Sequence, residues 1–105
     1  MGKIRTILGD INPEKMGVTN YHDHLITIGG GEVRVDKDLE LDSLENAIQA
    51  MHKYKRAGGT TFVDMNPIDC GRHIEYLVQI SEKTGVNIIS CTGFQRGIYY
   101  EGTHW

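Results

Sequence analysis

The sequence predicts an α/β fold in which parallel strands alternate with helices. After an N-terminal hairpin, the chain reads as strand, helix, strand, helix, strand. The helical stretches carry apolar residues at spacings of three and four, and the stretches between them are rich in Val, Ile, Thr and Phe. Strands separated by helices run parallel through right-handed crossovers. Functional groups in such folds gather at the C-terminal ends of the strands.

Composition bounds the classes of function. The 105 residues make at most one domain, and the net charge is −3. A nucleic-acid groove would need a sustained basic stripe, which is missing, and no apolar run approaches the ~20 residues that span a bilayer. The N-terminus lacks the apolar segment of a secretory signal. We therefore expect a cytoplasmic protein with a small-molecule partner, and reduced thiols at Cys70 and Cys91.

The first elements are short. Residues 3–8 are predicted to form a strand, and Gly9 and Asp10 a turn. Asn12 and Pro13 then predict a single helical turn, with the asparagine at the N-cap and the proline at the first helical position.

The next predicted strand, residues 18–28, carries the pattern His22-x-His24. Side chains alternate faces along a strand, so both imidazoles should point the same way and supply half of a metal site. Imidazole suits zinc, nickel, iron and copper alike, so the pair does not name the metal. Two histidines that merely lie near a strand end are the competing interpretation. Glycines at 29–31 predict a loop after the strand.

The first long helix should begin at the capping-box-like stretch from Asp42 to Glu45 and end at the glycines 58 and 59. Its expected buried stripe consists of Leu44, Ala47, Ile48, Met51 and Tyr54. Residues 60–65 follow as a buried strand, which Asn66 and Pro67 should end.

The second helix is expected from about residue 72 to 83, with Gly85 as its stop, followed by a strand over 86–91. Its predicted apolar face consists of Ile74, Leu77, Val78 and Ser81. Polar side chains fall at or near the ends of all three parallel strands: His22 and His24, Asp64 and Asn66, and Thr92 and Gln95. This coincidence favours a metal site over a chance pair of histidines.

The chain resembles the phosphotriesterase family of the amidohydrolase superfamily. The resemblance rests on residues 5–19 followed by His22-Asp23-His24, on 58–64 with Gly71-Arg72, and on 84–94, all in the family's order. It implies that residues 1–105 form the incomplete N-terminal part of a (β/α)8 TIM barrel, with about three βα units after an N-terminal hairpin.

By this resemblance, His22 and His24 bind the more buried of two divalent metals, with zinc expected. The family usually has Glu where this chain has Asp23, whose side chain should face away from the metal by strand alternation. Gln95 matches a position that lines the substrate pocket. Asp64 could orient a ligand, but a structural hydrogen-bonding role near the strand end is favoured. The family's bridging carboxylated lysine, two further histidines and proton-accepting aspartate have no counterpart here, so the catalytic residues stay unknown.

Three further histidines are expected to have ordinary roles. His52 and His73 should be solvated helix residues, and His104 should line a pocket or an interface. The implied activity is metal-assisted hydrolysis of a lactone, another carboxylic ester or a phosphotriester, with a lactone favoured.

Two other functions stay open. The chain could be an inactive barrel fragment that forms a homo-oligomer through its open sheet edges. It could also be a phosphomonoesterase of the polymerase-and-histidinol-phosphatase type, although the second- and third-strand motifs argue against it.

Overall fold

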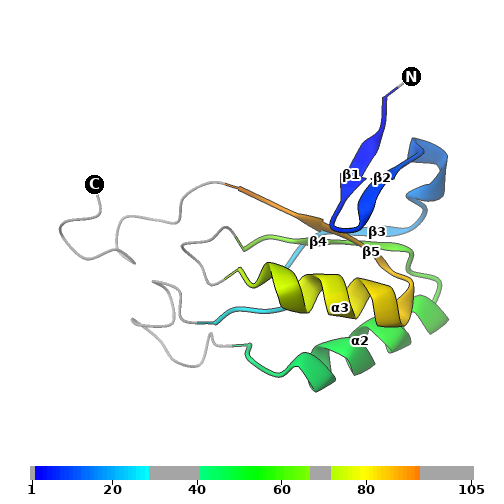
Figure 1. Ribbon diagram of the computed structural model, residues 1–105. Helices are drawn as coiled ribbons and strands as arrows, with labels where there is room; N and C mark the ends of the chain where they lie inside the picture. Colours follow the sequence, from blue (N-terminus) through cyan, green and yellow to red (C-terminus); the bar gives the residue numbers. More distant parts are fainter. Residues whose placement is uncertain (1, 29–40, 67–71, 93–105) are drawn as a thin grey trace, which may run out of the picture.

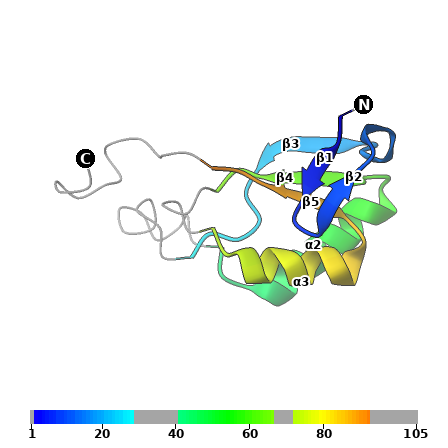
Figure 2. The ribbon, with the colours of Figure 1, turned by 45° about the horizontal axis from the view of Figure 1, so that its top comes forward.

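Three parallel strands form the centre of the fold, with two helices on one face and a hairpin on the other (Figures 1 and 2). The computed structural model describes residues 2–28, 41–66 and 72–92. In chain order the elements are β1 (Ile4–Thr6), β2 (Gly9–Ile11), the 3-10 turn η1 (Pro13–Lys15), β3 (Thr19–Asp23), α2 (Leu44–Arg56), β4 (Thr61–Asp64), α3 (Ile74–Thr84) and β5 (Asn87–Ser90). The sheet order β3-β4-β5 is parallel throughout, which confirms the predicted alternation.

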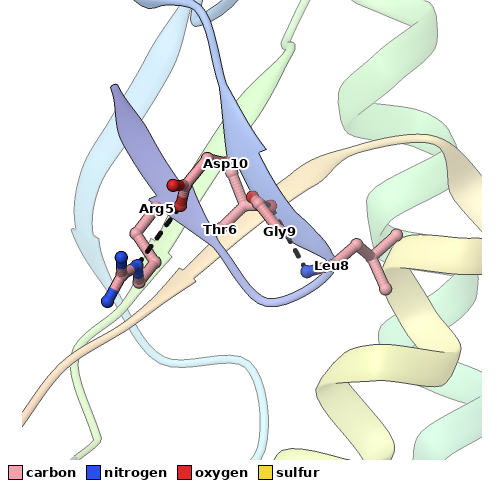
Figure 3. Close-up of polar contacts among 5 residues, drawn as sticks. All are labelled: Arg5, Thr6, Leu8, Gly9 and Asp10. Carbon is pink, nitrogen blue, oxygen red and sulfur yellow. Dashed lines mark hydrogen bonds and ion pairs between the residues drawn. The ribbon is translucent and has the colours of Figure 1, made fainter. Parts of the chain in front are cut away.

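The hairpin turns earlier than predicted. Gly9 and Asp10 do not form the turn; they begin β2, and residues 7 and 8 reverse the chain. Gly9 pairs with Thr6, whose hydroxyl donates a 2.6 Å hydrogen bond to the glycine carbonyl. Asp10 lies opposite Arg5, 3.2 Å from its Nε (Figure 3). These cross-strand contacts make both residues strand partners rather than turn residues.

The hairpin and η1 contact the sheet near the start of its strands. The backbone N–H of Ile7 donates a 2.7 Å bond to the carbonyl of Ile88 in β5. η1 forms where predicted, but Asn12 does not cap it through its side chain. The Asn12 amide oxygen instead accepts a 2.7 Å bond from Nζ of Lys3. The prediction that the Asn12 side chain caps η1 is therefore wrong, because the ammonium group of Lys3 binds its amide oxygen instead.

Both helices have side-chain caps. α2 begins one residue later than the predicted box, because Ser43 rather than Asp42 accepts the N–H of Asn46, at 3.1 Å. α3 is capped by His73, whose imidazole accepts the N–H of Tyr76 at 3.3 Å. The prediction that this histidine is merely solvated is wrong.

The hydrophobic core lies between the sheet and the helices. Its buried members are Leu25, Ile26, Ala47, Ile48, Met51, Phe62, Leu77, Ile80, Val86 and Ile88. The stripe predicted for α2 is confirmed in its centre. On α3, Ile74 is 40% exposed and Ile80 takes its place in the core, because the helix begins only at Ile74, at the margin of the sheet. Among the described helices, none is long and apolar enough to cross a membrane.

Tyr54 joins α2 to two strands. Its hydroxyl accepts the N–H of Asn20 in β3 at 2.9 Å and donates to the carbonyl of Thr61 in β4 at 2.7 Å. The ring packs against Gly59, where an added Cβ would lie 2.4 Å from ring atoms. The tyrosine predicted to be part of an apolar stripe thus also fixes two strands beside each other.

β3 is shorter than predicted. It ends at Asp23, and its pairing with β4 shifts in register between Asn20 and Asp23. The predicted strand over 18–28 is wrong beyond that point, because side chains of β4 and of the residues after it take over the backbone bonds of the following segment. That segment is buried nonetheless and brings Leu25 and Ile26 into the core.

Candidate metal centre

His22 and His24 lie side by side at the C-terminal end of β3. Their ring centroids are 6.0 Å apart, and the rings meet edge to face at 83°. Both side chains are exposed. The two rings therefore lie together, as the alternation of side chains along a strand predicts, although His24 lies one residue beyond the strand.

The pair suits a divalent metal in donor chemistry and in spacing. Zinc binds imidazole nitrogen at about 2 Å, so two rings that share one zinc have centroids about 5 Å apart. A small side-chain movement from the observed 6.0 Å would suffice. Within residues 2–28, 41–66 and 72–92, no third His, Cys, Asp or Glu joins them in a metal-binding group. The described residues therefore bring together two imidazoles, one fewer than the three protein ligands of a usual catalytic zinc site.

Asp23, between the two histidines, turns its carboxylate to its own backbone. One oxygen accepts the N–H of His24 at 2.8 Å, and the other accepts the side-chain amide of Asn20 at 3.1 Å. The Asn20 amide oxygen in turn accepts the N–H of His22, at 3.3 Å. These short-range bonds satisfy the backbone where the ladder with β4 breaks off.

His24 also contacts the residue that ends the neighbouring strand segment. Its Nδ1 lies 2.8 Å from Oδ1 of Asn66, which is fully buried. The amide nitrogen of Asn66 donates to the carbonyl of Ile26 at 2.8 Å and to Oδ1 of Asp64 at 3.2 Å. Asn66 therefore ties the ring of His24 to the backbone that follows it.

Asp64, the last residue of β4, binds the same segment. Its Oδ1 accepts the backbone N–H of Leu25 at 2.7 Å, the structural role that the sequence predicts. Its Oδ2 is buried, and no donor reaches it from the part of the chain that the structure describes. Burial raises the pKa of this carboxyl to about 6, against the opposing effects of the Leu25 N–H and the charge of His24.

The neighbouring strand β5 brings further polar groups to this end. Ser90 is paired with Asp64 in register, and its buried hydroxyl meets no partner among the described atoms. Cys91 follows it as a free thiol whose pKa is raised by burial and by the charge of Asp64. Its carbonyl accepts a 2.9 Å bond from the guanidinium of Arg72. The strand ends thus meet in one polar cluster, as the topology predicts.

Residues 2–104 match the model of the phosphotriesterase family. The chain belongs to the phosphotriesterase family. This finding confirms the resemblance drawn from the ordered motifs.

Similar proteins include lactonases. The chain is 38% identical to an uncharacterized protein of Mycoplasma pneumoniae, over 97% of this chain and 30% of that protein. It is 37% identical to a protein named phospho-furanose lactonase from Mycoplasmopsis agalactiae, over 93% of this chain and 28% of that one. The chain thus spans about 30% of the length of these phosphotriesterase-family relatives.

Two solved structures have the same fold as this chain. A lactonase from Listeria monocytogenes superposes with a TM-score of 0.86 at 34% identity, covering 93% of this chain and 30% of that one. An amidohydrolase from Mycoplasma synoviae gives 0.88 at 35% identity, covering 96% and 30%. The predicted N-terminal part of a (β/α)8 barrel is confirmed by these neighbours, with three barrel strands and two helices among the described residues.

The remaining residues singled out from the sequence lie on the surface or outside the described ranges. His52 is exposed on α2, as expected, and Thr92 is exposed just beyond β5. Gln95, His104, Cys70 and the glycines 29–31 lie outside the described residues.

Sequence reasoning missed the role of Asn66. It was expected only to end a strand, although it also stood among the polar residues at strand ends. Its contact with His24 spans 42 positions and depends on the register of β3 against β4. An asparagine two residues past a buried strand, beside a neighbouring strand whose end carries two histidines, is the signal that could have found it.

Proposed function

We propose that residues 1–105 form the N-terminal segment of a metal-dependent hydrolase barrel and supply two ligands, His22 and His24, to its metal centre. The observation that carries the proposal is the pair of exposed imidazoles, 6.0 Å apart, at the C-terminal end of the first parallel strand. Active sites of barrels of this type lie at that end. A divalent metal is the expected cofactor, with zinc first and two per complete site.

The proposed reaction is hydrolysis of a lactone. Water oxygen bonds to the carbonyl carbon, the ring C–O bond breaks, and the product is a hydroxy acid that has taken up the water protons. When bound, a divalent metal supplies a hydroxide near neutral pH and polarises the carbonyl oxygen. A lactone is preferred over a phosphotriester because relatives 37% and 36% identical to this chain are named phospho-furanose lactonases.

The chain's own residues prepare the site for this chemistry. Asp23 and Asn20 satisfy the backbone around His22 and His24, so the end of β3 keeps a defined shape. Asp64 holds the segment after His24 through the N–H of Leu25. Gln95 is proposed to line the substrate pocket. A cytoplasmic location and a small-molecule partner belong to the same proposal.

A second candidate follows from the incomplete ligand set. A catalytic zinc site usually has three protein ligands, and the described residues bring together two imidazoles. The 105 residues taken alone would then bind metal weakly, turn over no substrate and associate into a homo-oligomer through open sheet edges.

Zinc titration of the 105-residue chain tests the ligand assignment. We expect one weakly bound zinc per chain, lost in the double variant His22→Ala/His24→Ala. His52→Ala is the matched control, because it removes an exposed imidazole far along α2 from the strand end. Unchanged zinc binding in the double variant would show that the pair is not the ligand set.

The activity is tested on the native protein, isolated from its source. Its intact mass shows whether further strands belong to the same chain. It should hydrolyse a phosphorylated furanose lactone faster than a phosphotriester or a phosphomonoester. Faster turnover of the phosphomonoester would favour the phosphatase alternative instead. A mass near 11.8 kDa with no turnover would favour the associating fragment.

A further inference from the structure

The hydrogen bonds around Asn66 determine which way its amide points. One side-chain atom lies 2.8 Å from the Ile26 carbonyl oxygen and 3.2 Å from Oδ1 of Asp64. A carbonyl oxygen can only accept a hydrogen bond, and so can an ionised carboxylate. The atom facing them is therefore the NH2 nitrogen. The oxygen of the same amide then faces His24. The assignment follows from the partners, which is the proper basis for orienting an amide.

The amide orientation determines in turn the proton position on His24. The Asn66 oxygen can only accept a hydrogen bond, and it lies 2.8 Å from Nδ1 of His24. Nδ1 must therefore carry a hydrogen. In the neutral ring Nε2 is left with a free lone pair, which is the form that binds a metal.

We propose that Asn66 is a positioning residue that holds neutral His24 as the Nδ1–H tautomer and so makes Nε2 its ligand atom. The inference rests on the proposed function in one respect, the use of Nε2 for metal. A second group that orients a ligating imidazole in this way is common at metal sites, and its removal usually weakens metal binding about 10–100-fold.

The burial of Asn66 fixes the orientation of its amide. The side chain is fully buried, and both of its amide hydrogens have acceptors. A rotation that offered NH2 to His24 would place the amide oxygen against the Ile26 carbonyl and the Asp64 carboxylate. Those contacts would be repulsive and would leave buried acceptors without donors. The Nε2–H tautomer of His24 is therefore opposed by three contacts of Asn66: those with His24, the Ile26 carbonyl and Asp64.

His73 provides an opposite case within the same chain. Its Nδ1 accepts the backbone N–H of Tyr76 at 3.3 Å, so its neutral ring must carry the hydrogen on Nε2. The two histidines should therefore give opposite patterns in one nitrogen spectrum.

The test is ¹⁵N–¹H long-range NMR of the metal-free, histidine-labelled 105-residue chain at a pH where the rings are neutral. We expect Nδ1–H for His24 and Nε2–H for His73. A wild-type His24 that carries its hydrogen on Nε2 overturns the proposal, whatever the variants do.

The tautomer of His24 separates positioning from simple packing. Asn66→Leu keeps the branched shape of the side chain and removes the acceptor, so His24 should shift to mainly Nε2–H and zinc affinity should fall about 10–100-fold. His73 should be unchanged in this variant. A leucine variant that leaves the His24 tautomer in place overturns the proposal.

The outcomes also separate this inference from the proposed function. If His24 is Nδ1–H and zinc does not bind, the positioning contact stands and the metal function fails. If zinc binds through His22 and His24 while the metal-free His24 is Nε2–H, the metal function stands and the role of Asn66 is overturned.

Discussion

The carboxylate of Asp64 accepts a 2.7 Å hydrogen bond from the backbone N–H of Leu25 and so joins the end of β4 to the segment that follows the two histidines. The second carboxylate oxygen is buried with no donor from the described residues. Asp64 therefore holds the segment around Leu25 in place, and its ionisation costs free energy because the charge is buried.

The Asp64 carboxyl should make stability depend on pH. Burial raises its pKa from 3.8 to about 6 in the folded chain. Between these values the folded state binds the proton more tightly than the unfolded state, so stability should fall as pH rises from about 4 to 6. The loss is at most about 3 kcal/mol, since each pKa unit corresponds to about 1.4 kcal/mol.

Asp64→Asn should remove this fall, because the amide oxygen can still accept the Leu25 N–H and cannot ionise. Urea unfolding of both proteins from pH 4 to 8 measures the difference. Asp42→Asn removes an exposed carboxylate and is the control. Wild-type and Asp64→Asn curves that stay parallel across this range would contradict the assignment.

Tyr54→Phe should destabilise the chain by about 1–3 kcal/mol, because it leaves the partly buried N–H of Asn20 and the carbonyl of Thr61 without their partner. Chemical denaturation measures the change. Tyr21→Phe removes a hydroxyl from a side chain that is 80% exposed and should change stability little. Equal effects in the two variants would show that the Tyr54 hydroxyl does not hold the strands.

Gly59→Ala should cost about 1–3 kcal/mol through overpacking, since the new methyl group would lie 2.4 Å from ring atoms of Tyr54. The thermal midpoint should fall accordingly. Gly2→Ala is the comparison, because nothing lies within 4 Å of a Cβ at that position. A Gly59→Ala protein as stable as wild type would mean that the ring moves aside freely.

Ser43→Ala should destabilise α2 by about 1 kcal/mol, because the hydroxyl is the cap that accepts the Asn46 N–H. Ser43→Asp keeps an acceptor at the N-cap and should restore most of the loss. Helix content by circular dichroism and the unfolding free energy report the effect. A full loss in the aspartate variant would indicate that the serine acts through packing instead.

Elements governed by local pattern were predictable from the sequence. The stripe of α2, the buried strand β4 and the stop of α3 at Gly85 all follow from spacing, β-propensity and a left-handed glycine, whose φ is 75°. The placement of His22 and His24 side by side was also predictable, because alternation along one strand needs no knowledge of neighbouring strands.

Features that depend on register were not predictable. β3 ends early because a carboxylate and an amide from the end of β4 take the backbone of Leu25 and Ile26. The role of Asn66 depends on the same alignment, which no single stretch of sequence specifies. The bond from Lys3 to the Asn12 side chain is a further case, because Lys3 lies just before β1 and meets Asn12 only when the hairpin has formed.

The Tyr54 hydroxyl has a consequence for the geometry of His22 and His24 at the opposite end of the sheet. A strand rises about 3.3 Å per residue and cannot be compressed, so slippage of β3 by one residue against β4 would carry His24 out of reach of Asn66. The phenol bonds both strands near their first residues and opposes that slippage. Substitutions on the sheet-facing side of α2 would therefore alter the geometry of His22 and His24 without touching either residue. Under the proposed function, remote mutations there would change metal affinity.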